Sequence, residues 1–322
     1  MSNSIEKEKN MTNGKNSTLS LIKKDMKYRL REVKKHRALY MLMAPYLILF
    51  CAFTLLPVLI AIYFSFTSFN ILEEPKFIGL QNYFRLFLND EVFMIGLKNT
   101  MIFAVITGPL GFILPLVFAW LINELPRKLR VIFTVIFYAP SLTGGMTVVW
   151  NYLFSADAKG LFNAWLLEFG LIDDAISWTG DSKYMMGVMI FVILWTSMGT
   201  AFLSFIGGLQ GIDKQYYEAA AIDGIRNRWQ ELWYITLPLM KPQLLFGAVM
   251  SITSSFGIGS IIDSIMGFPS ADYAVHTVMN HLNDYGTTRY EMGYACAMAT
   301  LLFIVMLGSN TLIQKLLRKV GT

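Results

Sequence analysis

The sequence predicts an all-α polytopic membrane protein with six transmembrane helices, and two observations lead to this prediction. The 322 residues are 55% apolar and only 15% charged, with a mean hydropathy of +0.48, which excludes an ordinary soluble domain. Six apolar runs are also long enough to cross a bilayer, for which an α-helix needs about 20 residues. They are predicted at 38–66, 96–122, 130–154, 184–208, 240–263 and 289–314.

The segments between these runs define the rest of the organisation. Residues 1–37 contain eleven Lys or Arg against four acids and show no apolar periodicity long enough to fold, so a disordered or loosely helical cytoplasmic tail is predicted. Residues 67–95 are predicted to be an outer segment. Residues 96–315 are predicted to be a core of five helices that includes a polar loop at 209–240, and 316–322 a second cytoplasmic tail.

The orientation follows from the basic residues. If the N-terminus is cytoplasmic, twenty-one of the twenty-seven Lys and Arg lie on the cytoplasmic side. The positive-inside rule therefore predicts that both termini and the 209–240 loop are cytoplasmic. The net charge of +5 is explained by this topology and does not indicate a nucleic-acid partner, because no single folded face collects the basic residues. Cys51 and Cys296 lie in apolar runs, so they predict no disulfide framework and leave the redox compartment open.

The polar loop begins with signals for a short, narrow helix. Asp213 is a suitable N-cap for a helix that starts at Lys214, since its carboxylate can accept from the first free amides. Residues 219–221 are three consecutive alanines, which favour a helix and keep it thin. Gly224 is predicted to end the helix, because glycine adopts a left-handed C-cap conformation with the least strain.

A second short helix is predicted after Gly224. Its apolar residues follow helical spacing and are expected to lie on neighbouring helices, while the charged side chains face elsewhere. This apolar stripe consists of Ile225, Trp229, Leu232, Trp233 and Thr236. Leu237-Pro238 then ends the helix. From the residues alone, a solvated loop that contains an amphipathic helix remains an equal alternative to a functional element.

The order Glu218-Ala219-Ala220, then Asp223-Gly224, then Leu237-Pro238 resembles the EAA loop of ABC importer permeases. The run Ile235-Thr236-Leu237-Pro238-Leu239-Met240-Lys241-Pro242 is similar to the maltose-type carbohydrate permeases in particular. We name residues 209–240 the EAA-like loop. It departs from the family in having Ile225 at a usually small position and Leu232 at a usually aromatic one. The stretch between Gly224 and Ile235 is also one residue longer than usual.

This resemblance implies a type I ABC importer permease fold in a bacterial-type cell (inner or plasma) membrane. It implies a second, related permease subunit, two copies of a cytoplasmic ATPase that bind ATP and Mg, and an extracytoplasmic sugar-binding protein, with no nucleic acid and with membrane lipid around the helices. It further implies that the EAA-like helix couples to the ATPase, with Glu218 pairing with a basic ATPase residue. The implied coupling residues are Tyr217, Glu218, Ala219, Ala220, Asp223 and Gly224.

The segment Phe77-Ile78-Gly79-Leu80-Gln81-Asn82-Tyr83 also resembles the phrase F-x-G-L-x-N-Y that precedes the transport core of these permeases. The alternative is an ordinary amphipathic segment in which Phe77, Leu80 and Tyr83 pack downward.

Catalytic and cofactor chemistry is not predicted in this chain. No G-x-x-x-x-G-K-[ST] loop occurs, so an ATPase must be a separate subunit. No charged residue lies near the centre of a predicted span, which argues against an ion-coupled carrier or a proton pump. His276 and His281 are five residues apart, a poor spacing for metal ligands on one helix, and a packed or solvated imidazole pair is the preferred interpretation. No Ser-His-Asp or Cys-His arrangement has supporting context.

Uncharged polar residues near two span centres are the candidates for a substrate cavity. They are Trp195, Thr196 and Thr200 in the fourth span and Ser251, Thr253 and Ser254 in the fifth, with Tyr138, Ser141 and Thr143 as weaker candidates. Close helix packing explains such hydroxyls equally well. As a functional site they would bind a neutral polyhydroxylated solute. The resemblance favours this interpretation, since sugar sites of the family lie mainly on the spans that flank the loop.

Two alternatives stay open. One is a membrane scaffold or sensory subunit that moves nothing, for which deletion would leave sugar uptake intact. The other is an importer for another small solute. A cationic residue or a helix N-terminus in the cavity would indicate amino acids or phosphate, and His or Cys would indicate a metal.

Overall fold

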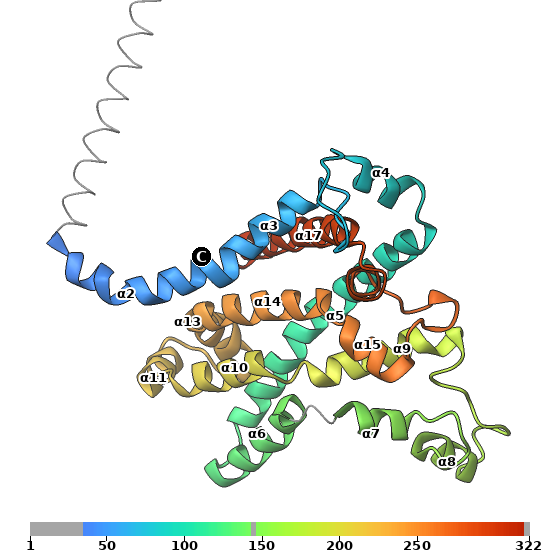
Figure 1. The fold of residues 1–322 in the computed structure, drawn as a ribbon. Coiled ribbons are helices and arrows are strands. Elements are labelled where there is room, and N and C mark those ends of the chain that lie inside the picture. The colour runs from blue at the N-terminus through green and yellow to red at the C-terminus, as the bar shows by residue number, and fades with distance from the viewer. Residues whose placement is uncertain (1–34, 143–145, 319–322) are drawn as a thin grey trace, which may run out of the picture. The chain divides into compact units, whose positions relative to one another are not determined.

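The computed structural model describes residues 35–142 and 146–318. These residues form helices, and the described chain has no strand beyond one isolated antiparallel bridge between Thr67 and Phe77 (Figure 1). The predicted all-α class is therefore confirmed. Most of the tail predicted at 1–37, and residues 319–322 of the tail predicted at 316–322, lie outside the described residues.

Contacts within the chain divide it into two compact units, residues 1–60 and 61–322. The described part of the first unit consists of α2 (Arg37–Phe50), the π-helical turn η1 (Cys51–Leu55) and the beginning of α3 (Leu56–Phe64). None of the residues in these elements is buried. A helix that is apolar on all sides and exposed in this way is typical of a span surrounded by lipid.

The second unit contains the remaining helices. In chain order they are α4 (Gln81–Leu88), α5 (Glu91–Asn123), α6 (Arg127–Leu142), α7 (Met146–Leu153), α8 (Leu161–Glu168), α9 (Ser182–Thr196), α10 (Thr200–Gln210), α11 (Lys214–Ile222), α12 (Arg228–Glu231), η2 (Leu232–Thr236), α13 (Leu237–Leu239), α14 (Lys241–Phe256), α15 (Gly259–Met266), η3 (Ala271–Tyr273), α16 (Val278–Asn283), η4 (Asp284–Thr288) and α17 (Met292–Arg318).

Four helical stretches in the described chain are long and apolar enough to cross a membrane: Arg37–Phe64, Glu91–Asn123, Ser182–Gln210 and Met292–Leu317. Two bent helix pairs, Arg127–Ser141 with Met146–Leu153 and Arg228–Leu239 with Lys241–Phe256, raise the number to six if each pair is one span. The second pair bends by 82°. The bend falls at Met240, between Pro238 and Pro242, where the proline rings prevent a continuous hydrogen-bond ladder.

Besides the bent pair within 130–154, two more of the runs predicted as single spans contain breaks. The run at 184–208 is divided at Ser197–Gly199, so that α9 ends and α10 begins near the middle of the apolar stretch. The run at 240–263 is divided at Gly257 and Ile258, between α14 and α15. The last long helix begins at Met292, after the π-helical turn η4. Hydropathy cannot reveal such breaks because the residues around them remain apolar.

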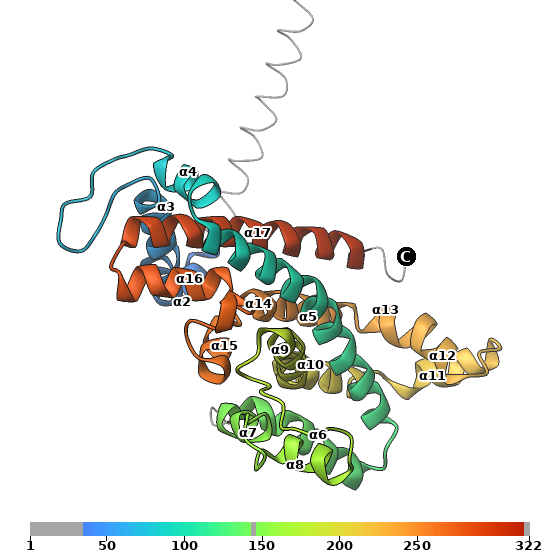
Figure 2. The same ribbon diagram turned by 90° about the vertical axis from the view of Figure 1, so that its right-hand side faces the viewer.

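Helices α5, α10 and α14 pack against one another and form the centre of the second unit (Figures 1 and 2). Phe202, Phe205 and Met240 are buried in the cluster they share. Gly247 of α14 permits this packing, because a Cβ atom there would lie 2.3 Å from the ring of Phe205. The close approach matters for function, since α10 leads into the EAA-like loop and α14 leads out of it.

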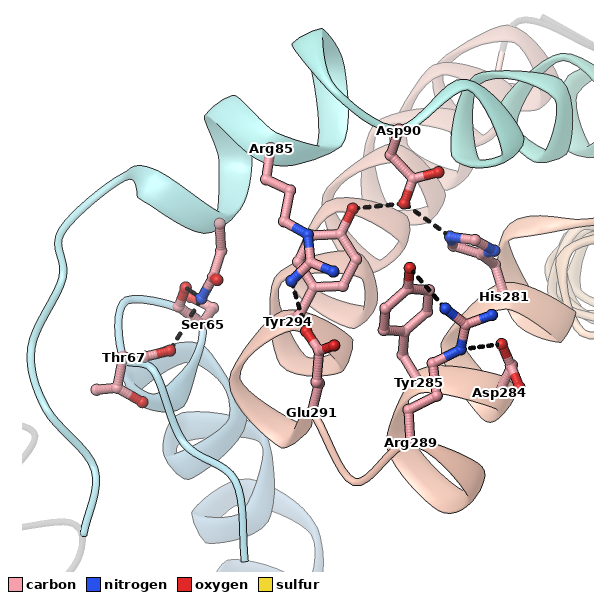
Figure 3. Close-up of polar contacts among 11 residues, drawn as sticks. Ser65, Thr67, Arg85, Asp90, His281, Asp284, Tyr285, Arg289, Glu291 and Tyr294 are labelled. Carbon is pink, nitrogen blue, oxygen red and sulfur yellow. Dashed lines mark hydrogen bonds and ion pairs between the residues drawn. The ribbon is translucent and has the colours of Figure 1, made fainter. Parts of the chain in front are cut away.

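A polar cluster joins α4, the start of α5, α16 and α17 (Figure 3). Asp90 accepts a hydrogen bond from the Tyr294 hydroxyl at 2.7 Å, and its Oδ2 atom lies 3.0 Å from Nε2 of His281. Its other oxygen accepts from the amide of Phe93 at 2.8 Å and caps α5. Arg85 lies 2.5 Å from Glu291, with its guanidinium over the Tyr294 ring. These bonds fix the N-terminal start of α5 relative to α17.

The F-x-G-L-x-N-Y segment is held in place by its asparagine, Asn82, which is not one of the apolar residues expected to pack in the amphipathic alternative. Phe77 and Leu80 are exposed, so the prediction that they pack downward in that alternative is wrong. Buried Asn82 instead donates from Nδ2 to the carbonyls of Ser65 and Thr67, both at 2.9 Å. Asn82 thereby fastens α4 to the chain that leaves α3.

Candidate functional site

The first helix of the EAA-like loop is α11, and it begins as its sequence predicts. Asp213 lies at the N-cap and its Oδ1 atom accepts from the amide of Gln215 at 3.1 Å. Glu218 and Ala219 are exposed, whereas Ala220 is buried. The alanine run therefore gives a helix with one small face packed inward and Glu218 directed to the surface.

Gly224 ends α11 with a left-handed conformation, φ +96°. The amide of Gly224 donates to the carbonyl of Ala221 at 3.4 Å, and the amide of Ile225 donates to that of Ala220 at 3.0 Å. These two bonds form a Schellman motif, which satisfies the last carbonyls of the helix. A Cβ atom at Gly224 would meet nothing within 4 Å, so the backbone conformation, rather than crowding, requires glycine here.

Tyr217 and Asp223 have roles that the resemblance alone did not distinguish. The Tyr217 hydroxyl lies 3.0 Å from the hydroxyl of buried Thr236 and so ties α11 to η2. Asp223 is exposed at the C-cap of α11. Of the implied coupling residues, Glu218, Ala219, Asp223 and Gly224 are thus on the surface, while Tyr217 and Ala220 hold the loop together.

The stripe predicted for the second helix is only partly correct, since Ile225 and Leu232 are half-buried but the two tryptophans are not. Trp229 and Trp233 are 70% and 66% exposed, whereas Ile235 and Thr236 are buried. The π-helical turn Leu232–Thr236 contains one extra residue, which shifts Trp233 and the side chains after it around the helix axis. Trp229 precedes this turn and lies against Trp120 at the end of α5. This turn has the length needed to accommodate the additional residue between Gly224 and Ile235.

The EAA-like loop also contacts the end of α5, far away in sequence. The ring of Trp229 packs against that of Trp120, with 5.1 Å between centroids. Arg228 forms an ion pair with Glu124, and another with Glu231 of its own helix. The loop is therefore attached to α5 as well as to α10 and α14.

A cavity of about 310 Å³ lies where α9 breaks into α10, beside α5 and α14. Four of the six predicted cavity residues line it: Thr196, Thr200, Ser251 and Ser254. Trp195 and Thr253 do not. Trp195 packs edge-on against Trp150, and the Thr253 hydroxyl is exposed and donates to the carbonyl of Val249 at 2.9 Å.

Other residues that line the cavity are either weaker candidates from the sequence or are not predicted by it. Ser141 lines the cavity, but Tyr138 packs in the core shared by α5, α10 and α14, and Thr143 is outside the described residues. Thr107, Ser197 and Ser255 also line the cavity. The signal that could have found Ser197 and Ser255 is their adjacency to predicted residues, whereas nothing local indicates that Thr107 of α5 approaches α14.

Most of the lining hydroxyls are already hydrogen-bond donors to backbone. Ser251 donates to the carbonyl of Gly108 at 2.6 Å and so joins α14 to α5. Thr196, Ser254 and Ser197 donate to carbonyls of their own helices at 3.0, 2.9 and 2.6 Å. A hydroxyl has one donor proton and two lone pairs, so these side chains offer mainly acceptor sites to the cavity.

The electrostatics of the cavity come from backbone rather than from ionised side chains. None of its described lining residues is Asp, Glu, Lys or Arg. However, the break in the fourth span places the first residues of α10, Thr200 and Ala201, on the cavity wall, and their N-cap, Gly199, supplies no side-chain acceptor. The free amides and dipole at a helix N-terminus attract negative charge.

His276 and His281 form a packed pair, one of the two arrangements preferred from the sequence. Nε2 of His276 lies 3.1 Å from Nδ1 of His281, and both side chains are buried. Burial of the His276 side chain, and to a smaller extent the neighbouring His281, lowers the pKa of His276 from 6.5 to about 4. The negative charges of Asp284 and Asp90 oppose this shift but do not cancel it. Among the described residues no group of three or more His, Cys, Asp or Glu is arranged to hold a metal ion.

Residues 123–320 match the family described as the binding-protein-dependent transport system inner membrane component. The probable ABC transporter permease YesP of Bacillus subtilis (strain 168) is 33% identical over 87% of this chain and 90% of its own length. The arabinooligosaccharides transport system permease AraP of the same organism is 30% identical over 88% of this chain and 89% of its own length.

A solved structure has the same fold. It is a chain of a bacterial ABC transporter involved in the import of the acidic polysaccharide alginate, with a TM-score of 0.75, 21% sequence identity, and coverage of 91% of this chain and 99% of that one. The arrangement of α5 to α17 is thus a known fold. From the match of the greater part of the sequence and the similarity to YesP, the chain belongs to the family of inner membrane components of binding-protein-dependent ABC transport systems.

Proposed function

We propose that this chain is the permease subunit of an ATP-driven importer for sugars or oligosaccharides. The observation that carries the proposal is the connection between the two candidate sites. The 310 Å³ cavity is bounded by α10 and α14, and these helices enter and leave the EAA-like loop directly. A displacement of the loop therefore acts on two helices that line the cavity.

The chemistry of the cavity supports a polyhydroxylated solute. Its hydroxyls donate to backbone carbonyls and present lone pairs, which suit the many O–H donors of a sugar. The related permease AraP is named as part of an arabinooligosaccharide transport system. A neutral sugar needs no charged partner, in agreement with the uncharged side chains of the described lining.

The partners follow from the exposed part of the loop and from the family. Glu218, on the exposed face of α11, would pair with a basic residue on a cytoplasmic ATPase that binds ATP and Mg. Two ATPase copies, a second permease and an extracytoplasmic sugar-binding protein would complete the importer. Both termini and the loop would be cytoplasmic, as the distribution of Lys and Arg favours.

The proposed mechanism is alternating access. ATP binding would bring the ATPase subunits together and move α11, and Gly224 would set the angle at which this movement passes through α12 and α13 to α14. Because α10 and α14 pack closely at Gly247, they would move as one body and change the side on which the cavity opens.

A second candidate substrate is an acidic sugar, because the N-terminus of α10 lies on the cavity wall. A helix N-terminus in the cavity was the feature expected for an anionic solute. Competition for uptake of a radiolabelled oligosaccharide separates the two candidate substrates. Unlabelled neutral arabino-oligosaccharides should block this uptake if the hydroxyls dominate recognition. Unlabelled alginate oligosaccharides should block it if the helix N-terminus dominates.

Uptake of radiolabelled arabino-oligosaccharides by cells tests the proposed function. Deletion of the gene should abolish uptake, and Thr200→Val should raise KM about five- to tenfold, as expected for the loss of one hydrogen bond of about 1 kcal/mol. Thr253→Val is the matched control, since Thr253 is outside the cavity. Undiminished uptake after deletion would instead identify a scaffold or sensory subunit.

Reconstituted vesicles test the coupling role. Glu218→Lys should suppress the ATPase activity that the binding protein stimulates, because it reverses the charge offered to the ATPase. Glu74→Lys, an exposed acid outside the loop, should leave that stimulation unchanged. Full stimulation in Glu218→Lys would remove Glu218 from the coupling site.

A further inference from the structure

A second cavity, of about 480 Å³, lies behind the EAA-like loop. Its wall includes Trp120 and Asn123 from the end of α5, Arg130 from the first turn of α6, and Lys214 and Tyr217 from α11. The apolar stretches Glu91–Asn123 and Ser182–Gln210 both end at this cavity. It therefore lies at the level where membrane-spanning helices meet water and lipid headgroups.

Two buried polar atoms in the wall have no hydrogen-bond partner among the described residues. They are Nε of Arg130, a donor, and Oδ1 of Asn123, an acceptor. The Arg130 side chain is held in place through Nη2, which donates to the carbonyl of Leu125 at 3.2 Å. Buried polar groups are rarely left unpaired, because each costs about 1–3 kcal/mol. The wall thus lacks one acceptor and one donor.

The charges on the wall are only partly matched. Arg228 is 3.2 Å from Glu124 and 2.7 Å from Glu231, so these three side chains balance one another to within one negative charge. Arg130 and Lys214 add two positive charges to the same wall. The cavity can therefore hold a group that is negative near Arg130 and carries N–H or O–H donors elsewhere.

We propose that this cavity binds a phosphodiester that carries a hydrogen-bond donor, the chemistry of a phosphatidylethanolamine or phosphatidylglycerol headgroup. The phosphate accepts from Arg130, and the ammonium or hydroxyl group donates to Asn123. Tryptophan and tyrosine, here Trp120 and Tyr217, are the aromatic residues enriched at membrane interfaces. Basic pockets between membrane helices on the cytoplasmic side are known to bind lipid headgroups.

The bound headgroup contacts both fixed and movable parts. Asn123 and Arg130 belong to the α5–α6 corner, whereas Lys214 and Tyr217 belong to the first helix of the EAA-like loop. Lipid composition therefore affects the position of the loop. The binding itself is independent of the solute and of the partners in the proposed function, so it can be tested separately from transport.

Lipid retention provides the test. The chain is purified in its native assembly, exchanged into nanodiscs of phosphatidylcholine mixed with phosphatidylethanolamine or phosphatidylglycerol, and its bound lipids are counted by native mass spectrometry. Phosphatidylethanolamine and phosphatidylglycerol should be retained in preference to phosphatidylcholine, whose choline group has no N–H or O–H donor. Arg130→Gln should reduce retention about tenfold, as for one charge-assisted bond.

Two further variants control the experiment. Lys128→Gln removes the same charge from the same corner but lies outside the cavity, and it should retain lipid like the wild type. Asn123→Leu removes the unpaired acceptor and keeps the branching and number of heavy atoms of the side chain, and it should bring retention of phosphatidylethanolamine down to that of phosphatidylcholine. This variant keeps the proposal testable if Arg130→Gln does not assemble.

Soluble glycerophosphoethanolamine is a phosphodiester like the lipid headgroup, and adding it to nanodiscs that contain only phosphatidylcholine distinguishes the two sources of this chemistry. Saturable binding that Arg130→Gln abolishes, without lipid preference in the first assay, identifies a free phosphodiester as the ligand. Preference for the two lipids without binding of glycerophosphoethanolamine identifies the membrane lipid. Equal retention of all three lipids, together with no binding of glycerophosphoethanolamine, overturns the proposal.

Discussion

The guanidinium of Arg228 lies 3.2 Å from the carboxylate of Glu124, which joins α12 of the EAA-like loop to the end of α5. The neighbouring Trp229 packs on Trp120 one turn earlier in α5. The EAA-like loop is therefore attached to three helices. It connects α10 and α14 in sequence, and it contacts α5 through tertiary packing. The movement of the loop proposed above would therefore also act on α5, which lines the 310 Å³ cavity through Thr107.

Removing the Arg228–Glu124 pair should affect transport more than stability. Both side chains are largely exposed, at 63% and 41%, so Glu124→Gln should lower the free energy of unfolding by less than about 1 kcal/mol. Its effect on coupling should be roughly 0.5–2 kcal/mol, or about two- to thirtyfold in transport rate. Stability is measured by thermal unfolding and transport by the rate of uptake, with Glu74→Gln as the matched control in both assays. Adding Glu124→Gln to Arg228→Gln should cause little further loss, because Arg228→Gln already removes this pair together with the pair to Glu231. An additional loss as large as that of Glu124→Gln alone would show that the two residues act separately.

Substitution of Gly224 should strain the backbone without any clash. At φ +96° a residue with a Cβ atom is unfavourable by about 1–2 kcal/mol, although the surrounding space is open. Gly224→Ala should therefore lower the stability of the loop and the stimulated ATPase activity. Gly187→Ala in α9, where a Cβ atom also meets nothing within 4 Å, should be neutral or stabilising. Gly224→Asn should be milder than Gly224→Ala, since asparagine tolerates the left-handed region; the reverse order would contradict this explanation.

The contact between Gly247 and Phe205 predicts a strong effect of one methyl group. A Cβ atom at Gly247 would lie 2.3 Å from the buried Phe205 ring, so Gly247→Ala should destabilise the protein by about 1–3 kcal/mol. Gly207→Ala, on α10 with open space around it, is the control. Adding Phe205→Leu to Gly247→Ala should recover part of the lost thermal stability. No recovery would mean that the cost of Gly247→Ala arises elsewhere.

His276 predicts a loss of stability in mild acid. Its folded-state pKa of about 4 is below the ordinary 6.5, so the unfolded chain binds more protons between these values and stability decreases as pH falls through that window. The shift corresponds to at most about 3 kcal/mol. Hydrogen bonds from Tyr294 and His281 outweigh burial and lower the pKa of Asp90 from 3.8, so Asp90 contributes only below the window.

Thermal unfolding at pH 7 and pH 4.5 measures this dependence. The difference in midpoint between the two pH values should shrink in His276→Gln and stay unchanged in His36→Gln, a substitution of an exposed histidine in the first unit. An equal pH dependence in the wild type and in His276→Gln would assign the acid sensitivity to other groups.

Several features could be predicted from residues close together in the chain. The N-cap at Asp213 and the left-handed end at Gly224 depend on side-chain and backbone chemistry within one helical turn. The exposed position of Glu218 follows from a helix whose inward face is alanine. The hydroxyls of Thr196 and Ser254 were recognised as cavity residues because their spans flank the loop.

The predictions that failed depended on register or on distant partners. One π-helical turn moved Trp233 out of the expected buried stripe. Thr253 shares its residue type with the cavity residues but lies on the exposed side of α14. Thr107 reached the cavity although nothing in its own segment marks it.

The sequence by itself determined that the chain is helical and membrane-spanning, where its EAA-like loop begins, and how the first helix of that loop is capped. These properties depend on the length of apolar runs and on the chemistry of single turns. Only the tertiary structure decided that the fourth span breaks at a cavity, that Tyr217 faces inward, and that Arg228 is fastened to Glu124. A one-dimensional pattern records the period and polarity of each helix, but the rotation of one helix against another is fixed only when all of them pack together.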